Sequence, residues 1–178
     1  NAERLLDANP EAAQRISLRL QPRSEQLFRQ LIKPDEQIDF TLCNPPFHAS
    51  AEAARAANQR KWQQLGKQPE SKAGTLNFGG QANELHCAGG EAGFLSRMAT
   101  ESAEFGQQVF WFSSLVSNAD SLKQLPAQLR ELGATDVRIL DMAQGQKRSR
   151  LLAWTFLDKK QRRAWRKARW PAPAKPAG

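Results

Sequence analysis

Four consecutive residues, Asn44, Pro45, Pro46 and Phe47, are of the types that could hold a planar substrate. They follow the apolar run at residues 38–43. Because proline cannot donate a hydrogen bond to a sheet, a strand must end here. The residue before each proline also favours extended geometry, which makes the turn stiff. A stiff turn that presents an amide, carbonyl oxygens and an aromatic ring at the end of a strand suits ligand binding.

The chemistry that fits this turn is recognition of an exocyclic amine, such as that of adenine. The Asn44 side-chain carbonyl and the Pro45 backbone carbonyl can each accept one hydrogen bond from the amine. Holding both hydrogens draws the nitrogen toward tetrahedral geometry and directs its lone pair at an electrophile, so no strong base is needed. Phe47 can stack on the base, which is worth roughly 1–3 kcal/mol. The alternative is a structural turn with Phe47 in the core.

Basic residues are concentrated at the end of the chain. The net charge is +8, and the segment from Lys147 onward has eleven Lys and Arg against one acid, Asp158, which leaves −2 for residues 1–146. The same segment contains Trp165 and Trp170. Lys and Arg bind phosphates and indole rings stack on bases, so the segment predicts contact with a polyanion such as RNA. The alternative is a solvated basic tail that maintains solubility.

Several protein classes do not fit this composition. Cys43 and Cys87 are too few for a disulfide scaffold and match no metal-site spacing, so we expect free thiols in a cytoplasmic protein without a metal. No stretch reaches the length of a membrane span, and no signal peptide is visible. The chain opens at Asn1 in what reads as the end of a helix, so we expect it to be part of a longer protein.

Apolar periodicity predicts the elements that position these residues. The expected helices are residues 3–8, 25–32, 91–105 and 121–132, and the expected strands are residues 16–20, 38–43, 109–112, 137–142 and 151–157. Residues 48–88 have little apolar periodicity and are expected to be a long insertion on the substrate side. Residues 158–178 are expected to be a basic, disordered tail.

This alternation of helices and strands predicts an α/β fold with a mostly parallel layered sheet. The last two strands are joined by a connection at residues 144–148, short enough for an antiparallel hairpin. In such sheets ligands bind beyond the carboxyl ends of the strands. The turn at residues 44–47 is therefore expected on the ligand-binding edge.

The segment "NPPF" after "DFTLC" resembles motif IV of the class I S-adenosylmethionine-dependent amino-methyltransferases. Three further segments, "HCAGGEAGF", "FWFSSLV" and "MAQGQKRSRLLAWTF", with their spacing, resemble the ribosomal RNA large subunit methyltransferase F family. The resemblance runs from about Glu3 to Leu157. It implies a Rossmann-like sheet, S-adenosylmethionine as cofactor, and methyl transfer to adenine N6 in large-subunit (23S) ribosomal RNA, either free or in a ribosome assembly intermediate.

By this resemblance Asn44, Pro45 and Phe47 are the catalytic residues, and Asn44 and Arg23 contact the cofactor. The candidate substrate-binding residues are Pro46, His48, Glu91, Lys147, Arg148 and Arg150. A histidine beside a turn can also be incidental, and a glutamate at a helix start can simply interact with the helix dipole.

The resemblance also implies that part of the fold lies upstream. The first strand of the family, its glycine-rich cofactor loop and the acidic residue that ends its second strand should all precede Glu3, and none is present. We therefore expect residues 1–157 to be the C-terminal part of the catalytic domain.

Three alternatives remain open from the sequence. Guanine-N2 ribosomal RNA methyltransferases carry a similar "NPPFH" motif, which fits His48. Glutamine methyltransferases that act on release factors carry a related turn, usually with Tyr, but the basic segment argues against a protein substrate. The third alternative is a non-catalytic RNA-binding module.

Overall fold

The computed structural model describes most of the chain in two units. The described residues are 2–46, 87–144 and 147–170, with the backbone alone at 143–144 and 147–148. Phe47, His48 and all but the last two residues of the expected insertion at 48–88 lie outside this range. Residues 1–35 form one unit and residues 36–178 the other, and each is described by itself.

The first unit is helical at its start and irregular afterwards. Helix α1 (Ala2–Asp7) forms where a helix is expected, and the short α2 (Pro10–Ala13) follows it. The strand expected at residues 16–20 is wrong, because the alternation is present but these residues pair with no other described strand. A strand needs a neighbour for its backbone hydrogen bonds, and alternation alone does not supply one.

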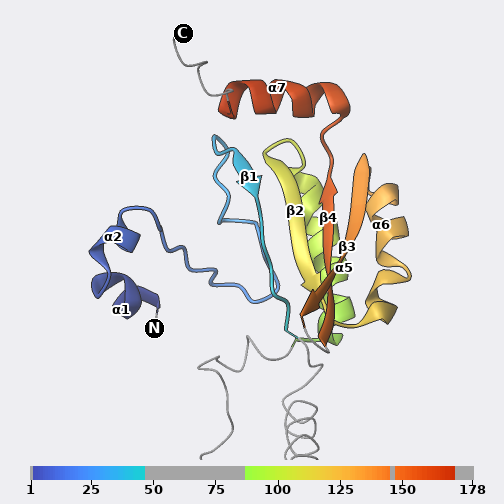
Figure 1. The fold of residues 1–178 in the computed structure, drawn as a ribbon, viewed down its shortest axis with the longest axis horizontal. Coiled ribbons are helices and arrows are strands. Elements are labelled where there is room, and N and C mark those ends of the chain that lie inside the picture. The colour runs from blue at the N-terminus through green and yellow to red at the C-terminus, as the bar shows by residue number, and fades with distance from the viewer. Residues whose placement is uncertain (1, 47–86, 145–146, 171–178) are drawn as a thin grey trace, which may run out of the picture. The chain divides into compact units, whose positions relative to one another are not determined.

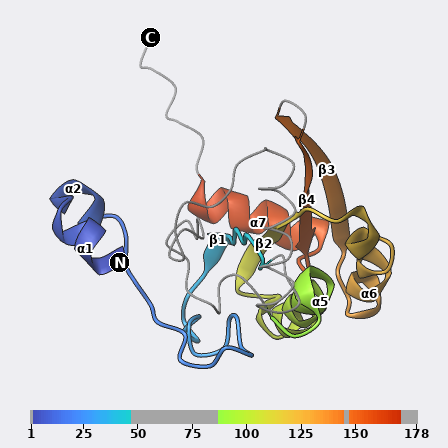
Figure 2. The ribbon, with the colours of Figure 1, turned by 90° about the horizontal axis from the view of Figure 1, so that it is seen from below.

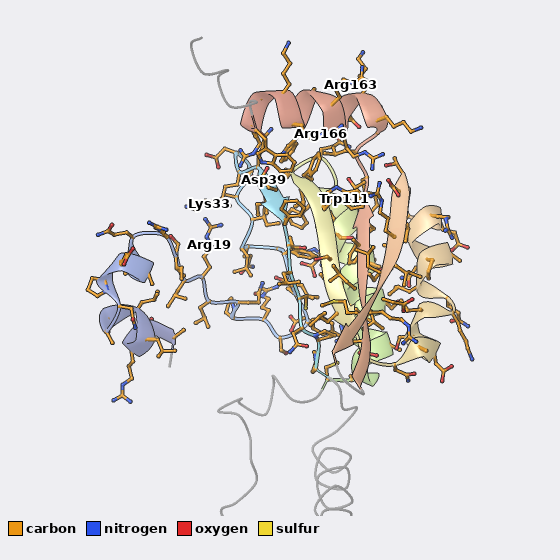
Figure 3. The ribbon with its side chains drawn as sticks, in the orientation of Figure 1. Arg19, Lys33, Asp39, Trp111, Arg163 and Arg166 are labelled. Atoms are coloured by element: carbon orange, nitrogen blue, oxygen red, sulfur yellow. The ribbon has the colours of Figure 1, made fainter. Side chains whose placement is uncertain are left out.

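The helix expected at residues 25–32 is also wrong, and turns take its place. Gln30 has a φ of 67°, in the left-handed region that interrupts a right-handed helix. Arg19, labelled in Figure 3, reaches this segment and donates a hydrogen bond to the Leu31 carbonyl at 2.5 Å. The left-handed Gln30 and this hydrogen bond hold the segment as an irregular loop.

The second unit is built on a four-stranded mixed sheet of order β1-β2-β4-β3 (Figure 1). The strands are β1 (Ile38–Phe40), β2 (Val109–Val116), β3 (Asp136–Gln144) and β4 (Lys147–Thr155). β1 is parallel to β2, whereas β4 is antiparallel to both β2 and β3. The α/β class and the C-terminal antiparallel hairpin are confirmed, and β1 with β2 represents the expected parallel part.

Two helices pack together on one face of this sheet, as Figure 2 shows for α5 (Gly90–Ser102) and α6 (Leu125–Glu131). Each has a short 3-10 helix beside it, η1 (Ala103–Phe105) after α5 and η2 (Ala119–Leu122) before α6. The expected helices at 91–105 and 121–132 are therefore confirmed, although each is divided in two.

The core lies between these helices and the sheet. Its fully buried apolar side chains include Leu95, Met98, Val109, Leu129 and Leu152. Trp154 fills its centre: the ring stacks on Phe112 with centroids 5.7 Å apart, and its indole N–H donates to the buried Ser102 hydroxyl at 2.9 Å. Burial of that indole costs little because its one donor is satisfied.

A helix stands where the sequence predicts a disordered tail. α7 (Lys159–Arg169) corrects that expectation for residues 158–170, while residues 171–178 lie outside the described part. Asp158 starts it with a capping box, since its carboxylate accepts from the Gln161 backbone N–H at 2.7 Å and the Gln161 side chain accepts from the Asp158 N–H at 2.8 Å.

α7 lies across the end of the sheet where β2 begins and β4 ends (Figure 1). Trp165 is the buried residue of α7, and it packs in a cluster with Phe110 and Leu157. The Trp165 indole N–H donates to Asp39 of β1 at 2.7 Å, and Arg169 binds the same carboxylate through two nitrogens at 2.8 and 3.1 Å. The hydrogen bond from Arg169 is the main reason that the pKa of Asp39 is lower than usual.

The other end of α7 is tied to β3. Arg162 donates to Asp136 at 2.7 Å, and Arg138 binds the same carboxylate at 3.0 Å. These two guanidinium groups, with Arg138 the stronger influence, lower the pKa of Asp136. α7 is therefore fastened at both edges of the described sheet, from β1 to β3.

Candidate active site

The segment after β1 continues alongside β2 and carries the turn to the carboxyl edge of the sheet. The Thr41 N–H donates to the Trp111 carbonyl at 3.0 Å, and the Cys43 N–H donates to Ser113 at 3.1 Å. The Leu115 N–H then donates back to the Cys43 carbonyl at 2.8 Å. This parallel pairing places the next residue, Asn44, beside the carboxyl end of β2, where the sequence predicts it.

The turn itself has a buried support and an exposed amide. Pro45 and Pro46 are buried, whereas Asn44 is exposed. Among the described residues, neither the Asn44 side chain nor the Pro45 carbonyl has a hydrogen-bond partner. The buried proline pair therefore fixes the backbone at this point, and among the described residues no partner occupies the two acceptors.

Cys43 is a structural neighbour of this turn and not a nucleophile at neutral pH. Burial raises the pKa of its thiol, and a hydrogen bond with Ser114 offsets this only in part. A thiol must ionise to attack an electrophile or to bind a metal. The chemistry of the turn therefore rests on its oxygen acceptors.

Glu91 is buried and holds the loop that follows β2. One carboxylate oxygen accepts from the Ser117 N–H at 2.6 Å and hydroxyl at 2.7 Å, and the other from the Asn118 N–H at 2.9 Å and the Ser121 hydroxyl at 3.0 Å. Its side chain is 5% exposed. With four internal bonds, its contribution is to position the loop at the carboxyl edge.

The turn before α5 brings Glu91 beside the loop that follows β2. Gly89 has a φ of 79°, and a Cβ there would lie 3.0 Å from the Gly93 Cα. A side chain at Gly93 would in turn lie 2.8 Å from the Ala88 carbonyl oxygen. Both positions require glycine, because a side chain at either would be too close to the backbone at the start of α5. The Glu91 bonds then hold this start of the helix beside the end of β2.

We expect Glu91→Gln to lower the free energy of unfolding by about 2 kcal/mol, because the amide NH₂ cannot accept the bonds from Asn118 and Ser121 and leaves buried donors unpaired. Urea denaturation measures this change. Glu131→Gln, on the exposed end of α6, is the matched control and should leave stability unchanged. Unchanged stability of Glu91→Gln together with weaker RNA binding would instead indicate a direct substrate contact.

The first basic residues of the C-terminal segment lie at the same edge as the turn. Lys147 and Arg148 begin β4, and Arg150 pairs with Val116, the last residue of β2. The Arg150 side chain is 24% exposed, and its Nε lies 3.4 Å from an Asp141 oxygen. The hairpin thus brings three basic residues to the carboxyl edge, close to the level of Asn44 along the sheet.

Other site candidates are not placed relative to this edge. Arg23 belongs to the first unit, which is described by itself, and Phe47 and His48 lie outside the described residues. Among the residues that the structure describes, no group of three or more His, Cys, Asp or Glu could hold a metal ion. Over the same residues, no helix is both long and apolar enough to cross a membrane.

Sequence comparison places the chain among RNA-modifying enzymes. Residues 1–158 match the model of a family described as RNA methyltransferase. The chain is 57% identical over 173 residues to the ribosomal RNA large subunit methyltransferase F of Pseudomonas aeruginosa, covering 97% of this chain and 52% of that protein. The enzyme of the same name from Pseudomonas putida is 48% identical over 170 residues, with 95% and 54% covered. The chain spans about half the length of these curated relatives.

A solved structure shares the fold. The human Mettl16 catalytic domain, in complex with hairpin 1 of the MAT2A 3′UTR, matches with a TM-score of 0.69 and 27% identity over 89% of this chain and 52% of that one. The match confirms a methyltransferase-type α/β sheet. The chain belongs to the RNA methyltransferase family that residues 1–158 match, as the ribosomal RNA large subunit methyltransferase F resemblance predicts.

Proposed function

We propose that the full-length protein transfers a methyl group from S-adenosylmethionine to the N6 amine of an adenosine in large-subunit ribosomal RNA. The observation that carries this proposal is the pair of acceptors at the carboxyl edge of the sheet, the Asn44 side chain and the Pro45 carbonyl, which have no hydrogen-bond partner in the described part of the chain. The names of the curated relatives support the ribosomal RNA substrate.

The Asn44 and Pro45 oxygens accept the two hydrogens of the adenine amine and make its nitrogen more tetrahedral, so that its lone pair points away from the ring. The buried proline pair fixes the Pro45 carbonyl and the backbone of Asn44 before the substrate arrives, which lowers the cost of ordering the two acceptors during the reaction. Phe47 stacks on the base in this proposal. The excess proton leaves the amine for solvent after transfer.

The two candidate cofactor-binding residues of this chain, Asn44 and Arg23, are polar and fit the proposed cofactor. When bound, S-adenosylmethionine supplies an electrophilic sulfonium methyl. Asn44 offers an exposed acceptor at the edge where ligands of α/β sheets bind, and we propose that it also contacts the cofactor, with Arg23 on the loop of the first unit. We propose that the remaining contacts to S-adenosylmethionine come from the part of the full-length protein that corresponds to the other half of these relatives.

Phosphate contacts at this edge are assigned to Lys147, Arg148 and Arg150, and substrate contacts to Pro46 and His48. The position of β4 supports the assignment of phosphate contacts to these basic residues, because β4 begins at the edge of the sheet where β2 ends. We further propose a cytoplasmic protein that acts on free ribosomal RNA or on a ribosome assembly intermediate, consistent with its two free cysteines.

The test is nucleoside analysis of unmodified large-subunit RNA after transfer of a labelled methyl group. The full-length protein is expected to produce N6-methyladenosine, and the chain of 178 residues serves as the comparison. Methylguanosine would assign the protein to the guanine-N2 alternative. No labelled nucleoside, with active substrate controls, would overturn the proposed enzyme activity and favour an RNA-binding module.

A further inference from the structure

A cavity of about 490 Å³ lies between α7 and the end of the sheet where β2 begins. Four aromatic side chains form part of its lining, namely Phe40, Phe110, Trp111 and Trp170. Five basic side chains form the rest, namely Arg138, Lys159, Arg162, Arg163 and Arg166. We call this site the α7 pocket. Its size is within the range of pockets that hold a small ligand or a nucleotide.

The positive charge of the α7 pocket is only partly neutralised. Among the described residues no Asp or Glu lines it, and two of its lining residues, Arg138 and Arg162, share the Asp136 carboxylate. Lys159, Arg163 and Arg166 have no acidic partner among the described residues. Figure 3 shows Arg163 and Arg166 on α7. The pocket therefore presents several cations that can pair with an anion.

These basic residues share one face of α7. Lys159 precedes Arg162 by three residues and Arg163 by four, and Arg166 follows these two by four and three, so the four side chains lie on neighbouring positions of one helix face. Trp170 follows Arg166 by four residues. This spacing places the four basic side chains at the pocket. Two other basic residues of α7, Lys160 and Lys167, are exposed and do not line it.

The aromatic side chains are arranged for stacking. Arg138 and Arg162 lie over the Trp111 ring at 5.0 and 5.5 Å from its centroid. Trp170 stacks on Phe40 with centroids 5.8 Å apart and rings 5° from parallel, yet it remains 39% exposed. Phe40 is 62% exposed. Exposed rings beside unneutralised cations are the combination that binds single-stranded nucleic acid, because bases stack while phosphates pair with Lys and Arg.

The α7 pocket is remote from the candidate active site. Trp111 lines the pocket and Leu115 lies beside the turn that presents Asn44. Leu115 is four positions further along β2, a distance of about 13 Å in an extended strand. Lys147 and Arg150 are at the turn's edge, whereas α7 follows the other end of β4 (Figure 1). α7 also begins where the match to the family ends, at residue 158.

We propose that the α7 pocket is a second RNA-binding site, which holds an unpaired nucleotide of the substrate through its phosphate and base while another nucleotide is at the Asn44 turn. This inference rests on the proposed function for the identity of the polyanion. Arg163, Arg166 and Lys159 bind the phosphate, and Trp170 stacks on the base. Aromatic stacking favours RNA over an acidic peptide, which would use the charges alone.

The experiment compares two double variants of the full-length protein that remove the same charge from the same helix. Arg163→Ala with Arg166→Ala removes two pocket cations, and Lys160→Ala with Lys167→Ala is the matched control. Binding of a labelled single-stranded RNA of about 12 nucleotides is followed by fluorescence anisotropy over a range of salt concentrations. Trp170→Ala is tested in the same way.

We expect the pocket variant to bind RNA about tenfold more weakly and to reduce the salt slope by roughly 1.4, since each phosphate contact on a single strand contributes about 0.7. The control should change affinity less than about twofold. Trp170→Ala should weaken binding about fivefold without changing the salt slope, because it removes stacking and not charge. The control should also leave the methylation rate at saturating RNA unchanged, because Lys160 and Lys167 do not line the pocket.

Equal losses in the pocket variant and its control would overturn the inference, since they would show a general electrostatic effect. Tight binding of an acidic peptide, with RNA binding unaffected by Trp170→Ala, would assign the pocket to a protein partner instead. The outcomes also separate this site from the proposed function. Wild-type methylation with RNA binding insensitive to the pocket variants defeats only the inference, and pocket-dependent RNA binding without methylation defeats only the enzyme activity.

Discussion

Asn44→Ala is expected to lower the rate of methyl transfer at saturating RNA by at least about 100-fold. Removing the side-chain acceptor leaves one of the two amine hydrogens unbound, so the nitrogen lone pair is no longer held toward the electrophile. Losses of this size are typical when a preorganised hydrogen-bonding group is removed or when a reacting atom is misplaced by about 1 Å. Single-turnover kinetics with labelled methyl transfer measures the rate.

The same variant should leave other properties of the protein nearly unchanged. Asn44 is exposed and makes no hydrogen bond with another described residue, so the melting temperature should remain that of the wild type. RNA affinity should change less than about twofold, because the basic residues supply most of it. Asn44→Asp retains an acceptor oxygen and should lose less activity than Asn44→Ala. Weaker RNA binding with an unchanged rate would make Asn44 a binding residue only.

Trp165→Ala is expected to lower the free energy of unfolding by about 3–5 kcal/mol, the range for removing a buried tryptophan. The substitution leaves a cavity beside Phe110 and Leu157 and removes the indole N–H bond to Asp39. α7 should then separate from the sheet, and RNA should bind at least as weakly as it does to the pocket variant. Urea denaturation measures stability, and hydrogen exchange of the α7 amides measures its attachment.

Trp170→Ala is the matched control for this effect. Trp170 lies five residues further along the chain and is 39% exposed, compared with 8% for Trp165. Its removal should cost less than about 1 kcal/mol and leave α7 protected from exchange. A full stability loss in Trp170→Ala, or none in Trp165→Ala, would contradict the packing described for α7.

Local patterns in the sequence were sufficient for the strands and the turn that hold the candidate active site. The apolar run before Asn44 and the two prolines predict a strand over residues 38–43, and the structure has the shorter β1 at Ile38–Phe40, followed by an isolated parallel bridge from Cys43 to Ser114. The continuous apolar run at residues 109–112 and the pair of strands joined by a short connection likewise appear as β2 and the β3–β4 hairpin. The positions of these strands and of the turn depend mainly on residues that are close together in the sequence.

The patterns failed where the outcome depends on distant partners. The alternation at residues 16–20 has no pairing strand among the described residues, and Gln30 adopts a left-handed conformation inside the expected helix. The sequence also contained a signal for α7 that the charge run obscured, because Asp158 and Gln161 have the spacing of a capping box. Trp165 and Asp39, 126 residues apart, fasten that helix.

The sequence by itself determined that the chain carries an Asn-Pro-Pro turn after an apolar run and a strongly basic C-terminal segment. Tertiary structure alone decided where that charge is placed. β4 spans about 26 Å, so it carries Lys147 to Arg150 to the edge beside Asn44 and delivers α7 to the opposite end. The fold also brings Trp111 of β2 and Arg138 of β3 together in the lining of the α7 pocket. One run of charge in the sequence is thus two separate surfaces in the fold, because an extended strand separates its ends.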